Sequence, residues 1–378
     1  MDEIFRVLHL VISLECGGLE QLVVKLVIKR NKRYPSSTFI CCLDKTGELG
    51  SQLPDDVVFS LNANRSKLPW DYQAVVRLKD WIKSCSQPFS SLILHAHNVA
   101  AWQYAVLAAR ETGAKVVYTQ HGANIHNIGI KNRLRSIVLS WFTDRIITVS
   151  NHTALSMVRH LGIPRRKIVV IHNGVDINQL QENSLINEST NYRERFGIPP
   201  ESFIIGSVGR FSPEKNYSLL IRAFHALVTS YRFPPKADSA VAETSGQEDG
   251  QKPNSLQPIA YRLLLLGDGP ERGKLEKLIK DLGIEDKVIM PGMQADVLPW
   301  LEQMDVFCLS SKTEGLSISA LEAGSLGIPL VMTDVGGCSE ITDGNNCGII
   351  VPPDNERALV DAFVHLREDE TRRKELGQ

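Results

Sequence analysis

Residues 306–333, VFCLSSKTEGLSISALEAGSLGIPLVMT, contain the pattern that decides the fold. The apolar run at 306–309 predicts a buried strand, a helix is expected over about 317–326, and residues 329–333 predict another strand. A strand, a helix and a strand in succession favour a parallel pair with a crossover helix. This stretch therefore predicts one repeat of a parallel sheet covered by helices.

The same alternation extends over the rest of the chain. Strand patterns occupy residues 5–14, 38–43, 91–95, 115–119, 145–149 and 168–171, with helical patterns at 18–30 and 102–110. A second series has strand patterns at 203–208, 262–266 and 287–290, with helical patterns at 217–230 and 274–282. Two such series predict an α/β protein with two Rossmann-like, doubly wound domains that face each other across a cleft.

The length of the chain agrees with two domains. A chain of 378 residues, 43% of them hydrophobic, is too long for one ordinary core. The polar segment around 175–193 is the expected linker, which gives domains at residues 1–185 and 186–378. Residues 231–258 are rich in proline, serine, glycine and glutamate, so we expect a disordered surface insertion there, with a functional lid as the alternative.

Charge and cysteine content exclude several classes of protein. The 42 basic and 43 acidic residues nearly cancel, so no nucleic-acid partner is expected. The N-terminal sequence is typical of a core strand and not of a signal peptide, and no long apolar run predicts a membrane span. Seven scattered cysteines without a CxxC pattern favour reduced thiols, so a cytoplasmic location is expected.

Glu314 and Glu322 are the candidate ligand-binding residues of the stretch 306–333. Gly315 permits an unusual backbone angle, and Ser317 is placed to cap a helix whose first amides are otherwise unpaired. That helix start suits a diphosphate, and Glu322 on the second turn could accept both hydroxyls of a ribose. The alternative is an ordinary loop charge and a solvated helix residue. The small, apolar character of the helix disfavours this alternative.

Two further turns follow predicted strands in the second half. In SVGRFSPEKN the strand at 203–208 leads to Arg210 and Lys215, which together could clamp a phosphate. A solvated basic turn is the alternative. The GDGPERG turn at 267–273 lacks the glycine spacing of a dinucleotide fingerprint, so we expect a structural turn that lines the nucleotide pocket.

Glycines and histidines follow strands in the first half. Gly17 and Gly18 lie between the first strand and its helix, where they would let a substrate approach the backbone. Several histidines come after apolar strands: His95, His97, His121, His152 and His172. No histidine pair has a clear carboxylate partner in helical register, so no metal site is predicted. His121 is the best candidate for contacting a sugar.

The segment KNRLRSIVLSWFTDR, residues 131–145, combines basic and apolar side chains. It could lie on an anionic membrane as a basic amphipathic helix, which would make a peripheral membrane contact. A core helix with a solvated basic head explains the pattern equally well. Both interpretations stay open at the level of sequence.

Several motifs in one order resemble a known family. They are GGLE at 17–20, HAHN at 95–98, TQHG at 119–122, IHNGVD at 171–176, VGRFSPEKN at 208–216, LLLGDGPER at 264–272, VIMPGM at 288–293 and EGLSISALE at 314–322. Together they span nearly the whole chain. On these motifs the chain resembles the retaining GT-B glycosyltransferases of glycosyltransferase family 4.

The resemblance implies the roles of the donor residues. Arg210 and Lys215 would neutralise the donor diphosphate, and Glu322 would bind the ribose. Glu314 would hold the transferred sugar and the phosphates together with the backbone of three following residues, Gly315, Leu316 and Ser317. The first domain would serve the acceptor and the second the nucleotide sugar.

The resemblance also implies the groups around the sugar. His121 would lie near the sugar and, with Glu314, act at the reacting centre, whereas Gly17 and Gly18 would approach the donor phosphate and the acceptor. Such enzymes are generally metal-independent and use no cofactor. This chain agrees with that expectation, because no DxD motif follows a predicted strand.

The resemblance implies a hexosyltransferase of class EC 2.4. The expected donor is a UDP-sugar, with a GDP-sugar next, and the expected acceptor is a glycan or a lipid-linked glycan of cell-surface polysaccharide biosynthesis. Two alternatives are a sugar-nucleotide epimerase of the same fold and a non-catalytic nucleotide-sugar-binding partner. Relatives usually continue with a helix that crosses back to the first domain, whereas this chain ends at Gln378.

Overall fold

The chain folds into two units, each built on one parallel sheet. The computed structural model describes residues 5–15, 17–64, 71–84, 92–122, 125, 129–177, 192–230 and 260–377. The first unit runs to Gly174 and takes in the short segments Thr313–Ile318 and Gly336–Glu340, and the second holds the remaining residues from Val175 onward. The predicted linker and boundary fall mostly in 178–191, and the predicted insertion at 231–258 also lies outside the described residues.

The first sheet has the strand order β3-β2-β1-β4-β5-β6-β7, and every pairing in it is parallel. Its strands are β1 (Arg6–Val11), β2 (Thr38–Cys42), β3 (Val58–Ser60), β4 (Leu92–Ala96), β5 (Lys115–Gln120), β6 (Arg145–Thr148) and β7 (Ile168–Val170). The helices are α1 (Gly18–Arg33), α2 (Tyr72–Ser84), α3 (Val99–Thr112), α4 (Ile130–Trp141) and α5 (Asn151–Leu161).

Local sequence explains where two of these helices begin. The side chain of Asn98, which precedes α3, accepts a hydrogen bond from the backbone amide of Ala101. The side chain of Ser150, which precedes α5, accepts one from the backbone amide of Thr153. Both helices end at glycines in the left-handed conformation, Gly113 and Gly162. These caps satisfy amides and carbonyls that a helix end leaves without partners.

The second sheet has the order β10-β9-β8-β11-β12-β13 and is likewise parallel throughout. Its strands are β8 (Phe203–Val208), β9 (Tyr261–Leu266), β10 (Val288–Gly292), β11 (Val306–Leu309), β12 (Leu330–Thr333) and β13 (Gly348–Val351). The helices are α7 (Tyr192–Arg195), α8 (Tyr217–Ser230), α9 (Arg272–Asp281), α10 (Leu298–Leu301), α11 (Ile318–Ser325), α12 (Cys338–Ile341), α13 (Glu356–Glu368) and α14 (Glu370–Gly377).

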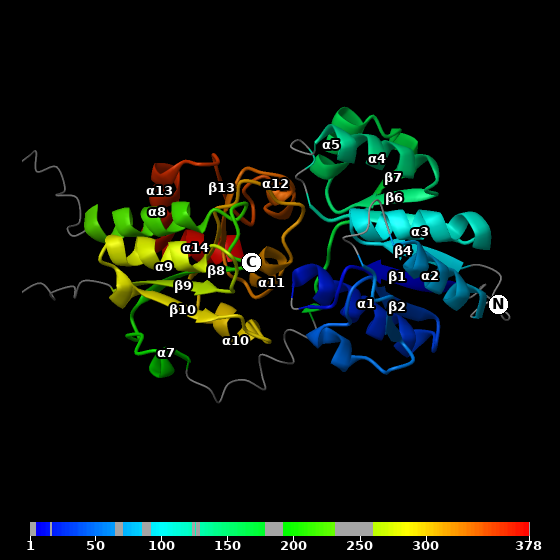
Figure 1. The fold of residues 1–378 in the computed structure, drawn as a ribbon. Helices are drawn as coiled ribbons and strands as arrows, with labels where there is room; N and C mark the ends of the chain where they lie inside the picture. The colour runs from blue at the N-terminus through cyan, green and yellow to red at the C-terminus, as the bar shows by residue number, and fades with distance from the viewer. Residues whose placement is uncertain are drawn as a thin grey trace, which may run out of the picture. The chain divides into compact units, whose positions relative to one another are not determined.

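Both units are doubly wound, as the alternation of strands and helices predicts (Figure 1). In each sheet the strand order reverses once, between β1 and β4 in the first unit and between β8 and β11 in the second. In open parallel sheets, ligands bind outside the carboxyl ends of the strands at such a reversal. The loops after these four strands are therefore the places to look for a site.

The helices of the described residues contain no candidate for a membrane span. None of them combines the length and the apolar character that crossing a bilayer requires.

Candidate functional site

The loop between β8 and α8 places two cations at the carboxyl end of a central strand. Arg210 is exposed, and Lys215 is half-buried. The loop after β11 holds this segment from the side: Ser310 Oγ donates to the carbonyl of Lys215 at 3.2 Å. The backbone amide of Lys312 donates to the carbonyl of Glu214 at 2.8 Å. The loops after the two strands at the reversal are therefore joined by hydrogen bonds.

The GDGPERG turn supports the same loop from its other side. The amide of Gly209 donates to the carbonyl of Leu266 at 3.0 Å, and the amide of Phe211 donates to that of Asp268 at 2.9 Å. Gly267 has a φ of 133°, and a Cβ added there would lie 2.0 Å from the carbonyl oxygen of Gly209. The two backbones thus lie closer than any side chain allows. This turn has the structural role that its sequence predicts.

Replacing Gly267 by alanine is expected to lower the free energy of unfolding by about 2 kcal/mol or more, because the added methyl group meets backbone in a strained conformation. Urea denaturation of the full chain measures the effect. Gly273→Ala is the matched control, since Gly273 lies in α9 with no atom within 4 Å of an added Cβ. Alanine there is expected to be neutral or stabilising by up to about 1 kcal/mol. Equal effects of the two changes would contradict this account of the turn.

The β11–α11 segment buries both of its glutamates. Glu314 lies in the loop and Glu322 on the second turn of α11, and each is 8% exposed. Ser317 directly precedes the helix, at the capping position that the sequence predicts. Ser319 Oγ donates to the carbonyl of Val208 at 3.1 Å, which ties the helix start to the end of β8. Both carboxylates are therefore buried, and neither is the solvated surface charge of the alternative interpretation.

Two glycines that the sequence analysis missed lie against this loop. A Cβ added at Gly336 would lie 1.6 Å from the carbonyl oxygen of Glu314, and Gly336 has a φ of 58°. The amide of Gly337 donates to the carbonyl of Gly315 at 2.9 Å. The adjacent pair after β12 was a detectable signal, because neighbouring glycines after a strand often permit a close backbone approach. Leu316, the remaining predicted donor residue, is buried.

In the first unit, the predicted glycines lie at the start of α1. Gly17 is the residue before the helix, Gly18 is its first residue, and the carbonyl of Gly17 accepts from the amide of Gln21 at 3.0 Å. A Cβ added at Gly17 would lie 2.3 Å from a carboxylate oxygen of Glu20. The side chain of Glu20 therefore folds over the helix start, where the helix dipole favours negative charge.

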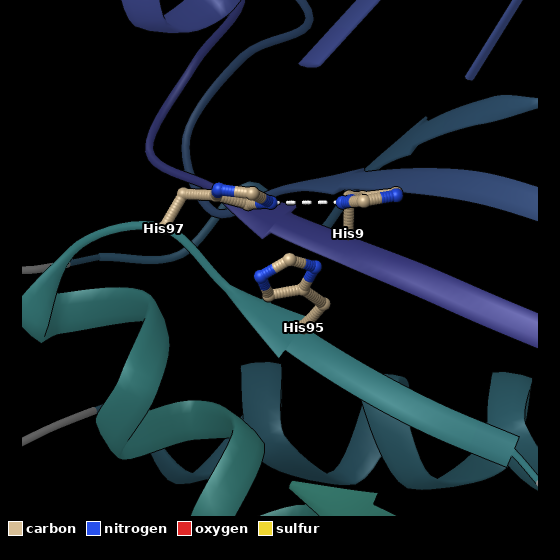
Figure 2. A group of neighbouring side chains, drawn as sticks. All are labelled: His9, His95 and His97. Atoms are coloured by element: carbon tan, nitrogen blue, oxygen red, sulfur yellow. Dashed lines mark hydrogen bonds between the residues drawn. The ribbon is translucent and has the colours of Figure 1, made fainter. Parts of the chain in front are cut away.

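A cluster of histidines lies in the interior of the first unit (Figure 2). His9 on β1 and His97 after β4 are buried, with His9 Nδ1 2.8 Å from His97 Nε2. The other ring nitrogen of His97, Nδ1, lies 3.0 Å from Nε2 of His121, which follows β5. His95 on β4 lies beside them and forms a 2.7 Å hydrogen bond with Thr119 Oγ1. His9 was not predicted as a site residue, because it lies within a strand.

Burial keeps these imidazoles uncharged near neutral pH. Desolvation lowers the pKa of His95 to about 4 and that of His121 to about 3. The pKa values of His9 and His97 are also well below the ordinary value, first because of burial and then because neighbouring histidines would repel a second charge. Each ring therefore has one N–H donor and one acceptor nitrogen.

The predicted site residues thus fall into two groups. Arg210, Lys215 and Glu322 belong to the second unit, on the segments after β8 and β11 that hydrogen bonds join. His121, which contacts His97, belongs to the first unit, as do Gly17 and Gly18. Residues 314–317 were predicted in the second domain, but they fall in the segment Thr313–Ile318 of the first unit. The other predicted histidines lie elsewhere in that unit, His152 on α5 and His172 after β7.

Comparison with known proteins identifies the family. The model of the family described as "Glycosyl transferases group 1" matches residues 188–378, and that described as "Glycosyltransferase Family 4" matches residues 16–179. The N-acetyl-alpha-D-glucosaminyl L-malate synthase of Bacillus anthracis is 25% identical over 76% of this chain and 68% of its own length. The UDP-Gal:alpha-D-GlcNAc-diphosphoundecaprenol alpha-1,3-galactosyltransferase of Escherichia coli is 24% identical over 73% and 66% respectively. The matches thus span about two thirds of these relatives.

A solved structure agrees in fold. Anabaena Alr3699/HepE, in complex with UDP-glucose, superposes with a TM-score of 0.76 and 20% identity over 98% of this chain and 92% of that one. The predicted GT-B architecture is confirmed by this likeness and by the two parallel sheets. The matched residues 188–378 include the segments that carry Arg210, Lys215 and Glu322. The chain belongs to the group 1 glycosyl transferases and is a glycosyltransferase of the GT-B fold.

Proposed function

We propose that the protein transfers a sugar with retention from a UDP-sugar to a lipid-linked glycan of a cell-surface polysaccharide pathway. The observation that carries this proposal is the pair of hydrogen-bonded loops after β8 and β11. Arg210 and Lys215 lie on the first loop, and the buried Glu322 lies beyond the second. Cations after one strand and a buried carboxylate after its neighbour fit the diphosphate and the ribose of one nucleotide.

The chemistry of transfer requires such cations. Cleavage of the bond between the anomeric carbon and phosphate places negative charge on the leaving diphosphate. Arg210, Lys215 and the amides at the start of α11 would stabilise this charge more in the transition state than in the ground state. These groups would do so without a metal ion, and we propose a metal-independent, cofactor-free reaction.

Named relatives support the choice of donor and acceptor. HepE was solved with UDP-glucose, and the Escherichia coli relative is named for a UDP-galactose donor and a diphosphoundecaprenol acceptor. The Bacillus anthracis relative is named for L-malate, a small soluble acceptor. We propose a lipid-linked acceptor because α4 exposes several large apolar side chains, which could contact a membrane.

Helix α4 turns its large apolar residues outward. Exposed apolar side chains recur along it at helical spacing: Ile130 (74% exposed), Leu134 (58%), Val138 (45%) and Trp141 (66%). The residues that it buries are Ser136, Leu139 and Ser140. Most large apolar residues of 131–145 are therefore exposed, whereas the core-helix interpretation predicts that they are buried. With the exposed Lys131, Arg133 and Arg135, this face has the character of a surface that binds an anionic membrane.

The double variant Leu134→Ser, Trp141→Ser is expected to bind anionic phospholipid vesicles at least about tenfold more weakly, since each exposed side chain would otherwise be buried in lipid. Vesicle co-sedimentation measures the partitioning. Leu26→Ser is the matched control, because Leu26 on α1 is also exposed (44%). Unchanged binding of the double variant, or equal binding to neutral vesicles, would contradict the membrane proposal.

Nucleotide release across UDP-, GDP- and ADP-sugars tests the proposed reaction. The full chain is incubated with each donor and a lipid-linked acceptor extract. We expect UDP release that requires the acceptor, and a product with the anomeric configuration of the donor by NMR. Release from GDP- or ADP-sugars alone, an inverted product, or an epimerised UDP-sugar without transfer would contradict the proposal.

A further inference from the structure

The imidazoles of His9, His97 and His121 form a hydrogen-bonded chain. Their two N···N distances, 2.8 Å and 3.0 Å, are those of ordinary hydrogen bonds. The ring planes of successive members are tilted by 24° and 30° relative to each other. The chain runs from a buried residue of β1 to a residue that is partly exposed after β5.

The central ring couples the protonation of the other two. Neutral His97 has one donor and one acceptor nitrogen, and both are engaged with imidazoles. If His97 donates to His9, it accepts from His121 through Nδ1, and His121 is left with Nδ1 as an acceptor. If His97 accepts from His9, it donates to His121, and His121 then carries its proton on Nδ1. Only these two arrangements satisfy both hydrogen bonds.

We propose that His9 and His97 are positioning residues that set the tautomer and ring orientation of His121. Because both ring nitrogens of His97 are engaged with imidazoles, changing the tautomer of one ring requires changing all three. This inference rests on the proposed function, and on the family resemblance that implies a place for His121 near the sugar, only for the role of His121 in transfer. There the tautomer decides whether Nδ1 donates to a sugar hydroxyl or accepts from one.

The geometry favours the hydrogen-bonded histidines over a metal centre. Ligand atoms of His9, His95 and His97 lie within 4.8 Å of one another, which is the arrangement that a metal ion would need as a starting point. Two nitrogens bound to one tetrahedral zinc ion at about 2.0 to 2.1 Å are separated by roughly 3.3 Å. His9 Nδ1 and His97 Nε2 are 2.8 Å apart, so they share a proton instead (Figure 2).

Nitrogen NMR of the full chain labelled with ¹⁵N-histidine tests the coupling directly. Protonated and unprotonated ring nitrogens have distinct shifts, so each tautomer is read without substrate. We expect a single tautomer for His121 in the wild type and a mixture or the opposite tautomer in His9→Leu. His9→Asn should restore the single tautomer, because its amide lies near the position of Nδ1 and can donate or accept.

Activity provides the second readout. We expect His9→Leu to lower kcat about five- to tenfold with the donor KM within about twofold, and His9→Asn to recover most of the loss. His95→Gln is the matched control. His95 forms its hydrogen bond with Thr119, outside the two hydrogen bonds that join His9, His97 and His121. If His9→Leu does not fold, His97→Gln supplies the same comparison, because its amide can reach His9 but not His121.

Three results would overturn the inference. The first is an unchanged His121 tautomer in His9→Leu and His97→Gln. The second is a changed tautomer with unchanged kcat, which would remove the positioning role. The third is stoichiometric binding of Zn²⁺ that His9→Leu and His95→Gln both abolish. Because the tautomers are measured without substrate, failure of the UDP-sugar assignment is distinguishable from failure of the chain.

Discussion

Replacement of Glu322 by glutamine is expected to lower kcat/KM for the UDP-sugar by about 100-fold or more. Glutamine keeps the shape of the side chain but donates on one side, so it cannot accept from both hydroxyls of a ribose. One hydrogen bond to a charged group, worth about 1.5 to 3 kcal/mol, is lost, and the other no longer has a charged acceptor, which together correspond to about 100-fold. Steady-state kinetics with varied donor concentration measure the change.

The matched control for this variant is Glu276→Gln. Glu276 lies on α9 of the same unit, where it pairs with Arg272 on the surface. We expect its kinetic constants within about twofold of the wild type, because exposed ion pairs contribute little. Equal losses of kcat/KM in the two variants would contradict a specific role of Glu322 in binding the nucleotide.

Replacement of Lys215 by alanine is expected to lower kcat about 10² to 10³-fold, the range found when one preorganised electrostatic contact is removed. The loops after β8 and β11 hold the backbone of Lys215 in place, so the main chain that carries this cation is fixed before charge develops on the leaving diphosphate. Single-turnover kinetics separate this loss from a change in donor affinity.

Lys274→Ala is the control for this second change. Lys274 lies in the first turn of α9, after the neighbouring strand β9, and its ammonium pairs with Glu271 on the surface. We expect kcat to stay within about twofold. A loss confined to KM in Lys215→Ala would contradict a role in the transition state, since uniform binding leaves kcat unchanged.

Much of the fold follows from the periodicity of the sequence. Strands β8 and β11 and helix α8 have the predicted limits, and most other elements differ by a few residues at their ends. Strands β3 and β13 and the helices α2, α5 and α13 were not predicted. The two short strands each lie at an edge of a sheet and carry little of the continuous apolar pattern that marks a central strand.

The candidate site was predictable only in part. Arg210, Lys215 and Glu322 follow strands in the sequence, and parallel strands bring their carboxyl ends to one edge of the sheet. His9 lies in the middle of a strand pattern, where a single histidine looks like an ordinary core residue. Its hydrogen bond with His97 spans 88 positions and depends on the pairing of β1 with β4. No local pattern encodes such a contact.

The outward apolar face of α4 shows a second limit of sequence reasoning. Apolar residues at helical spacing define a stripe but not which side of the helix faces the core. In α4 the small residues Ser136 and Ser140 pack inward, whereas Leu134 and Trp141 face solvent. Only the tertiary structure shows that most large apolar residues of 131–145 face away from the core.

Calorimetric titration of nucleoside diphosphates into the full chain tests the central claim most directly. The account predicts that UDP binds at one site per chain, that GDP and ADP bind more weakly, and that Glu322→Gln abolishes measurable UDP binding while Glu276→Gln leaves it unchanged. Wild-type affinity for UDP in Glu322→Gln, or no UDP binding by the wild type, would contradict the assignment of a UDP-sugar site to the second unit.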